Sequence, residues 1–358
     1  MIYVHVPFCK RFCTYCDFYS ELVQEGCFEA YARDLCEEIR SRADEVDDDP
    51  KTLYFGGGTP SVLPLSILSR ILIALDEAGH GGPWKEFTLE VNPEDIVEKG
   101  PTYVESLKAL GVNRVSIGVQ SFDDGILRWM NRRHDAARAA EAFRIVREAG
   151  IGNISLDLIF GIRHLSDAVW ADTVDRAVSL GAQHISCYQL TVEGESALAD
   201  MVSDGRYEEA DDTQCRRQYD LLCRKLTDAG YRHYEISNFA LPGYEAVHNG
   251  GYWERRPYAG FGPGAHSFRG NVRSWNSKEL HGWTATTETL SAEDALVETV
   301  MLSLRTDRGV DAAFLHENCS EEDIGRLVAG GALVREGGRY RIPEDRFFVS
   351  DEIVRELI

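Results

Sequence analysis

The sequence predicts an α/β fold, an open partial barrel of six β/α units followed by a small, mainly helical, winged-helix-like unit. Two observations predict it. Six strand-like runs alternate with amphipathic helical runs before about residue 205, and such alternation builds a parallel sheet with right-handed crossovers. Polar or glycine residues end several strand-like runs, at the edge where barrel-like sheets build their sites. Six units are too few for a closed eight-stranded barrel, so we favour an open partial barrel over a doubly wound sheet.

The strand-like runs are short and rich in β-branched and aromatic residues. They span 2–7, 52–57, 87–93, 114–121, 154–161 and 184–190. The helical runs carry apolar residues three or four positions apart, and most of them close on glycine. They span 28–42, 64–79, 101–111, 135–150 and 167–181.

The alternation stops after about residue 205. A helix is predicted over 211–230, and the glycine-, proline- and aromatic-rich segment 248–270 predicts loops. The tail predicts a helix, further short helices and two short strands around Gly337 and Gly338. We therefore expect three parts: the barrel over 1–205, a segment over 206–287 that packs on it, and the winged-helix-like unit over 288–358, acting as a structural cap.

Composition narrows the class of protein. The 358 residues carry 38 Lys and Arg against 59 Asp and Glu, a net charge of -21, which disfavours a nucleic-acid partner. No apolar run reaches the roughly 18 residues of a membrane span, and the first residues do not resemble a secretory signal. Cytoplasmic residence is therefore expected. Nine cysteines, an odd number, argue against a disulfide framework.

Three of the cysteines lie within eight residues. Cys9, Cys13 and Cys16 are spaced C-x3-C-x2-C and are followed by Asp17 and Phe18 with no further cysteine pair nearby. A structural zinc site usually takes four ligands from two separated pairs, and a 4Fe–4S cluster normally takes four thiolates. Three thiolates leave one iron open, which can bind a small molecule and pass it an electron.

This spacing, directly after a first strand, resembles the radical S-adenosylmethionine (SAM) superfamily. The motifs YVHVPFC, GGGTP, LEVNP, GVQSF, NRRH and DLIFG resemble, nearly end to end, its subgroup containing oxygen-independent coproporphyrinogen oxidase and a haem chaperone. The resemblance implies that Cys9, Cys13 and Cys16 hold a 4Fe–4S cluster whose open iron chelates SAM. The residues that it implies for SAM are Tyr3, Tyr15, Gly57, Gly58, Thr59, Glu90, Gln120, Arg132 and Asp157.

The last three of these match polar residues that line a second SAM site or the porphyrin side in the oxidase. The guanidinium of Arg132 suits a carboxylate of SAM or of a propionate.

Two departures separate the chain from the oxidase branch. Phe18 stands where that branch has a further cysteine, and the extension that precedes its cluster is not present before Cys9. The hexapeptide HNGGYW over 248–253 instead matches a haem-binding signature of the chaperone branch. The resemblance implies a neutral imidazole on haem iron and aromatic rings on the macrocycle. The implied haem contacts are His248, Asn249, Tyr252 and Trp253, with His266 as a weaker second candidate.

The resemblance thus implies a haem-trafficking chaperone that holds a 4Fe–4S cluster, SAM and haem and delivers haem to target haemoproteins such as respiratory enzymes. It is compatible with an electron donor for the cluster, peripheral contact with the inner face of the membrane, and a homodimer. The alternative is oxygen-independent coproporphyrinogen III oxidation. A third reading, a radical SAM enzyme acting on RNA, is disfavoured by the acidic balance. Whether SAM is cleaved, and whether the chain is an enzyme, stays open at this stage.

Overall fold

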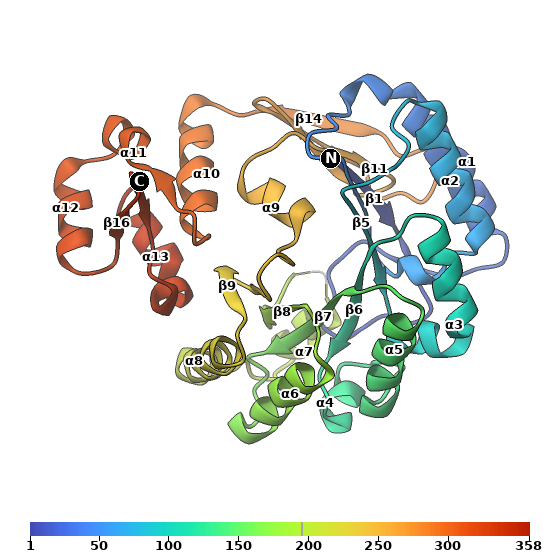
Figure 1. The fold of residues 1–358 in the computed structure, drawn as a ribbon, viewed down its shortest axis with the longest axis horizontal. Coiled ribbons are helices and arrows are strands. Elements are labelled where there is room, and N and C mark those ends of the chain that lie inside the picture. The colour runs from blue at the N-terminus through green and yellow to red at the C-terminus, as the bar shows by residue number, and fades with distance from the viewer. Residues whose placement is uncertain (195) are drawn as a thin grey trace.

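A nine-stranded sheet forms the centre of the molecule, seen in a computed structural model that describes residues 1–194 and 196–358 (Figure 1). Its order is β11-β1-β4-β5-β6-β7-β8-β10-β9. The six central strands are parallel, and they confirm the six predicted runs: β1 Ile2–Val6, β4 Thr52–Gly57, β5 Glu86–Val91, β6 Arg114–Gln120, β7 Asn153–Phe160 and β8 His184–Gln189. The fold is therefore the open α/β barrel that the sequence predicts.

The outer face of this sheet is covered by helices that follow the strands (Figure 1). Their apolar faces pack on the strands, as Tyr31, Leu35 and Ile39 of the first helix do. Aspartate or serine side chains cap three of the helices, as Asp135 does for the backbone amide of Arg138 (2.9 Å). The covering helices are α1 Cys27–Ser41, α2 Leu65–Glu77, α3 Pro93–Ala109, α5 Ala136–Glu148, α6 Asp167–Leu180 and α8 Asp212–Asp228.

Helix α3 is longer than predicted. The sequence predicts a helix over 101–111, but helical structure begins at Pro93. The two stretches meet at Gly100, whose φ of 73° lies in the left-handed region and breaks the helix there. The sequence therefore predicted only the second stretch. Two short helices were not predicted at all, α4 Asp124–Trp129 and α7 Ala197–Ser203.

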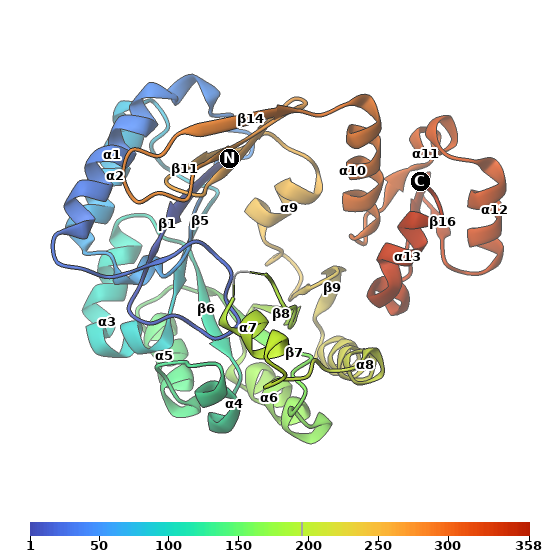
Figure 2. The same cartoon turned by 180° about the vertical axis from the view of Figure 1, so that it is seen from behind.

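The segment predicted as loops, 248–270, contains regular structure. It holds helix α9 (Val247–Trp253) and strand β11 (Ala259–Phe261), which pairs in parallel with β1. Helix α9 lies on the inner side of the curved sheet in both views (Figures 1 and 2). The other edge of the sheet is closed by β10 Asn238–Ala240 and β9 Arg232–Glu235, both antiparallel to their neighbours.

The remaining strands form three small sheets. Beside β1 lies an antiparallel sheet of β12 His266–Arg269, β13 Val272–Asn276 and β14 Ala285–Thr289. Strands β2 Phe8–Cys9 and β3 Glu21–Leu22 pair across the base of the cysteine loop. The third sheet belongs to the C-terminal unit and has the order β15-β17-β16, from Val310–Asp311, Arg339–Arg341 and Val334–Glu336.

The C-terminal unit is mainly helical, as the sequence predicts. It lies at the end of the molecule away from α1 to α3 (Figure 2). Gly337 and Gly338 both have positive φ, 57° and 80°, as a tight hairpin turn between its strands requires. Its helices are α10 Ala292–Leu304, α11 Ala312–Asn318, α12 Glu321–Ala329 and α13 Ser350–Arg355. No helix in the described part of the chain is long and apolar enough to cross a bilayer.

Candidate functional site

A cavity of about 730 Å³, which we call the cluster cavity, opens at the carboxyl end of the parallel strands. The inward faces of the strands line it. In β6 every second residue contributes, so that Arg114, Ser116, Gly118 and Gln120 face the cavity while the valines and isoleucine between them are buried on the opposite side. The sheet therefore presents one polar face to a single large cavity.

The cysteine loop forms one wall of the cluster cavity. Cys9 ends strand β2, and Cys13 and Cys16 follow in the loop between β2 and β3. All three thiols are free and partly buried. The Cys9 Sγ lies 3.4 Å from Thr59 Oγ1, and the Arg132 guanidinium donates to the Cys13 Sγ at 3.4 Å. The three predicted cluster ligands thus lie together in one cavity.

The donor set suits an iron–sulfur cluster better than a single metal ion. Among the described residues, no three histidine, cysteine or carboxylate side chains converge as ligands of one ion would. In a cubane cluster each thiolate binds a separate iron, so such convergence is not required. Burial raises the pKa of the Cys9 thiol, and it raises that of Cys16 to about 12. Thiolates at these positions therefore need positive charge from iron, which deprotonates a coordinating thiol.

The glycine segment at the end of β4 lets the cysteine loop approach the sheet. Gly57 has a φ of 107°, and a Cβ there would lie 2.6 Å from the His5 ring. A Cβ on Gly58 would lie 2.9 Å from the Phe8 carbonyl oxygen and 3.1 Å from the Cys9 Sγ. With Thr59, both glycines line the cluster cavity. Part of the reason for glycine here is therefore contact within the protein, in addition to room for a ligand.

Glu90 reaches the cluster cavity from the end of β5. The Tyr54 hydroxyl donates to its Oε1 at 2.6 Å. Burial raises the pKa of this carboxyl to about 7, against the lowering effect of the Tyr54 hydrogen bond. Glu90 is therefore a carboxylate that titrates near neutral pH.

Arg132 is fixed in the cavity wall. Its Nη2 donates to Asn92 Oδ1 and to the Gly118 carbonyl oxygen, both at 2.7 Å. Its Nε is buried with no acceptor among the described residues. A buried donor without a partner is costly in a folded protein. This orphan donor therefore fits the arrival of a carboxylate from a bound molecule.

Gln120, Asp157 and Tyr15 also line the cluster cavity. Gln120 has a φ of 65°, a conformation that non-glycine residues seldom adopt, and it follows an irregularity in the pairing of β6 with β7. Asp157 accepts from Ser116 Oγ at 2.9 Å, and burial raises the pKa of its carboxyl. Backbone outliers such as the one at Gln120 cluster at functional sites.

Helix α9 carries the HNGGYW hexapeptide and lies over the amino ends of β4 and β5. The buried carboxylate of Glu86 accepts from the backbone amides of Val247 (2.7 Å) and His248 (3.0 Å) at the start of the helix. His248 is 0% exposed. Its Nδ1 lies 2.8 Å from Thr52 Oγ1 and its Nε2 lies 2.8 Å from the Tyr252 hydroxyl.

Both ring nitrogens of His248 are thus hydrogen-bonded within the protein, and the haem contact that the sequence predicts for this residue stays a prediction. Its burial and its two hydrogen bonds explain why the imidazole serves the packing of α9. Asn249 reaches the cluster cavity, Tyr252 lines a neighbouring cavity, and Trp253 lines neither.

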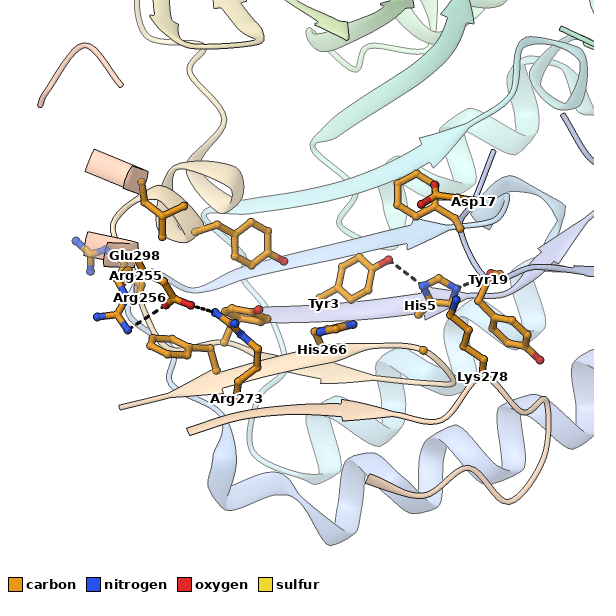
Figure 3. A pocket seen from close by; sticks show the side chains of 16 residues that line it. Tyr3, His5, Asp17, Tyr19, Arg255, Arg256, His266, Arg273, Lys278 and Glu298 are labelled. Carbon is orange, nitrogen blue, oxygen red and sulfur yellow. Dashed lines mark hydrogen bonds and ion pairs between the residues drawn. The ribbon is translucent and has the colours of Figure 1, made fainter. Parts of the chain in front are cut away.

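The neighbouring cavity, of about 530 Å³, we call the aromatic cavity (Figure 3). Tyr3 lines it, so the tyrosine expected at SAM lies here instead of in the cluster cavity. Asp17, Phe18 and Tyr19 line both cavities. The loop that carries the cysteines is therefore the wall between the two cavities.

Several lining residues of the cluster cavity were missed from the sequence. The alternation along each strand could have found them, since inward residues two apart share a face. Arg114 is the clearest case, a nearly fully buried charge at the start of a strand. Five of the missed residues on the strands are Tyr54, Arg114, Ser116, Ser186 and Tyr188.

Known proteins resemble this chain over most of its length. Residues 3–177 match the model of the Radical SAM superfamily. A protein named heme chaperone HemW from Mycobacterium tuberculosis strain H37Rv is 34% identical over 100% of this chain and 94% of its own length. One of the same name from Bacillus subtilis is 34% identical over 86% of this chain and 84% of its own length.

A solved structure shares the fold. Coproporphyrinogen III oxidase (HemN) from Escherichia coli, titled a radical SAM enzyme, matches with a TM-score of 0.81 over 99% of this chain and 89% of that chain. Its sequence identity of 21% supports a likeness of fold alone. The full-length identity to the curated relatives goes further, and this chain belongs to the radical SAM superfamily, in the family of proteins named heme chaperone HemW.

Proposed function

We propose that this protein is a haem chaperone that holds a 4Fe–4S cluster and SAM, binds haem and passes it to target haemoproteins. The observation that carries the proposal is full-length similarity, at 34% identity, to proteins named heme chaperone HemW. The residues around the cluster cavity support it, because they offer three thiols, an orphan arginine donor and a carboxylate in one place.

Cys9, Cys13 and Cys16 would hold the cluster, whose fourth iron supplies an open coordination position. The orphan Nε of Arg132 would receive the carboxylate of SAM, as a charge-assisted hydrogen bond. Glu90 would accept from the ribose hydroxyls. The segment Gly57–Thr59 would place backbone groups against the amino acid part, and Tyr15, Gln120 and Asp157 would complete the walls.

Coproporphyrinogen oxidation is the second candidate, favoured by the fold shared with the oxidase. Phe18 argues against it, because its ring stands where the oxidase branch has a cysteine, and 65% of it is exposed at the wall between the two cavities. We therefore propose that the phenylalanine belongs to a haem-handling site.

One assay separates the two candidates. The protein is purified without oxygen, its cluster is reconstituted, and haemin or coproporphyrinogen is added with SAM and a reductant. Stable haem uptake without conversion of coproporphyrinogen supports the chaperone. Stoichiometric formation of protoporphyrinogen would overturn it.

Delivery is a separate step of the proposal. A haem-loaded sample mixed with an apo-haemoprotein should lose its Soret band as the acceptor gains one, at a rate above that of free haemin release. If haem stays on the protein in the presence of acceptor, the carrier role is wrong even where binding is tight.

We also propose that residues 288–358 act as a structural cap on the barrel, that an external donor reduces the cluster, and that the target lies at a membrane.

A further inference from the structure

The aromatic cavity has the size and lining of a site for a flat apolar molecule. Its volume of about 530 Å³ falls within the range of about 300 to 1,000 Å³ typical of ligand sites. Six phenylalanine and tyrosine side chains line it among the described residues: Phe18 and Tyr19 from the cysteine loop, and four more from strand β1, helix α9 and the chain that leads into and through β12. These four are Tyr3, Tyr252, Tyr258 and Phe268.

The charged residues of this cavity have the opposite sign to the whole protein. Among the described residues that line it, four cationic side chains stand against two carboxylates, Asp17 and Glu298, which gives four minus two, a formal balance of +2. The chain itself carries -21. Figure 3 shows Arg255, Arg256 and Arg273 at one end of the cavity, around Glu298. Such a concentration of arginine in an acidic protein favours a ligand with carboxylates.

The carboxylates around these three arginines do not fully neutralise them. Arg255 and Arg273 share the single carboxylate of Glu298, at 3.2 Å and 2.5 Å. The Nε of Arg255 is buried without an acceptor among the described residues, and its Nη2 faces Glu298. Arg256 pairs with Glu254, a carboxylate outside the cavity lining, at 2.6 Å. Arg255 also has a φ of 51°, a left-handed conformation that few non-glycine residues adopt. The end of the cavity therefore holds donors that a further anion would satisfy.

One histidine of the cavity is available to a metal. Both ring nitrogens of His5 are already hydrogen-bonded. Its Nδ1 lies 3.0 Å from the Tyr3 hydroxyl and its Nε2 lies 2.9 Å from the Tyr19 carbonyl oxygen. His266 is exposed on β12, stacks on Trp275 at 6.2 Å between ring centroids, and makes no side-chain hydrogen bond among the described residues. In Figure 3 it lies between the arginine end and the Tyr3–His5 pair.

We infer that haem occupies the aromatic cavity, with His266 on the iron and the propionates at Arg255, Arg256 and Arg273. The inference rests on the proposed function, and it moves the iron ligand from His248, which is buried, to His266. The tyrosines and Phe268 would stack on the macrocycle. A haem placed here would lie beside the cysteine loop, because Asp17, Phe18 and Tyr19 line both cavities.

The iron contact is tested with His266→Ala. Haemin and metal-free protoporphyrin are titrated into the cluster-reconstituted protein, and the Soret band and fluorescence quenching are followed. We expect about tenfold or more weaker haemin binding, with protoporphyrin affinity unchanged, because only haemin has a metal to ligate. Added imidazole should restore the ligand-bound Soret spectrum. The matched control is His281→Ala, an exposed histidine paired with Asp34 outside the cavity, which should leave haemin binding unchanged.

The propionate contact is tested with Arg256→Gln and Arg273→Gln. Each variant should bind haemin about tenfold more weakly than the unaltered protein, which is the scale of one charge-assisted hydrogen bond. Neither should change affinity for haemin dimethyl ester, in which the propionates are capped. Arg232→Gln, an exposed arginine outside the cavity, is the control.

The outcomes separate this inference from the function beneath it. If the unaltered protein binds haemin and His266→Ala binds it equally well with the same spectrum, the location is wrong while haem binding stands. If protoporphyrin affinity falls together with that of haemin, His266 acts through the cavity shape and the iron contact is wrong. If the unaltered protein binds no haemin, the proposed function fails, and this inference fails with it.

Discussion

Glu90 is the residue whose charge state is most sensitive to pH near neutrality in the cluster cavity. Burial raises its pKa to about 7, whereas an unperturbed glutamate titrates at about 4.3. A carboxylate accepts stronger hydrogen bonds from hydroxyls than a carboxylic acid does. Binding of a ribose at this residue should therefore strengthen as Glu90 loses its proton.

We predict that SAM affinity of the cluster-loaded protein rises from about pH 6 to about pH 8 and that Glu90→Gln abolishes this rise. The same shift has a second consequence. Because the folded pKa lies above the unfolded value, the contribution of Glu90 to stability falls as pH rises from about 4.3 to about 7. The variant should therefore be more resistant to urea than the unaltered protein at pH 8. An unchanged pH dependence of SAM binding in the variant would show that Glu90 is not the group that causes it.

His248 gives a second residue-scale prediction. His248→Ala leaves Thr52 Oγ1 and the Tyr252 hydroxyl without their partner, which should cost about 2 kcal/mol or more of unfolding free energy. Burial lowers the pKa of this imidazole to about 3, below its unfolded value of about 6.5. The stability that it contributes is thus present above about pH 6.5 and is lost as pH falls toward 3.

Urea unfolding at about pH 7.5 and about pH 5.5 should therefore show a smaller difference between the two proteins at the lower pH. An equal difference at both values would contradict the buried neutral imidazole. The cysteines and the glycine segment could be found from sequence because their spacing is local. The direction that His248 faces could not, because it depends on Thr52, which is 196 residues away.

At the scale of elements, the strands that build the cluster cavity were predictable and the edge strands were not. Each central strand carries a run of apolar residues followed by a helix, a pattern visible within one β/α unit. Strand β11 has only three residues and is followed by Gly262 and Gly264, and it pairs with β1 near the other end of the sequence. The place of β11 in the sheet depends on tertiary contacts, so no local periodicity in the sequence predicts this strand.

The end of β4, which packs beside the cysteine loop, gives a prediction of its own. Gly57→Ala forces a left-handed alanine and places its Cβ against His5, which is held by Tyr3 and the Tyr19 carbonyl oxygen. The cost should be about 3 kcal/mol, the sum of backbone strain and overpacking. Gly230→Ala is the matched control, with a φ of 87° and no atom within 4 Å of the added Cβ.

That control should lose only about 1 kcal/mol in urea unfolding, which is the strain alone. Equal losses in the two variants would show that contact with His5 adds nothing. A larger loss at Gly57 should be accompanied by poorer cluster incorporation, since the same segment contacts Cys9.

At the scale of the whole molecule, two cavities share one wall. The sequence indicated cluster and SAM residues at the ends of the barrel strands and haem contacts over 248–253, but no second cavity beside the first. The aromatic cavity is assembled from residues 3–19 and 252–302, which come together because β11 pairs with β1 and β12 packs beside β11. The overall charge of -21 gives no indication that this cavity has a net positive lining.

A shared wall predicts coupling between the two cavities. A cluster and SAM would order the loop from Asp17 to Tyr19, and a haem in the aromatic cavity would then find that wall already fixed. We predict that SAM raises haemin affinity of the cluster-loaded protein by about fivefold or more, the lower range of allosteric coupling.

Linkage makes this prediction strict, because haemin must then raise SAM affinity by the same factor. Two phenylalanines of the loop provide the test. Phe18 lines both cavities, whereas Phe12 lines the cluster cavity and not the aromatic one. Phe18→Ala should lower the coupling factor toward one, and Phe12→Ala should leave it unchanged. Coupling that survives Phe18→Ala in full would mean that the cavities do not communicate through this wall.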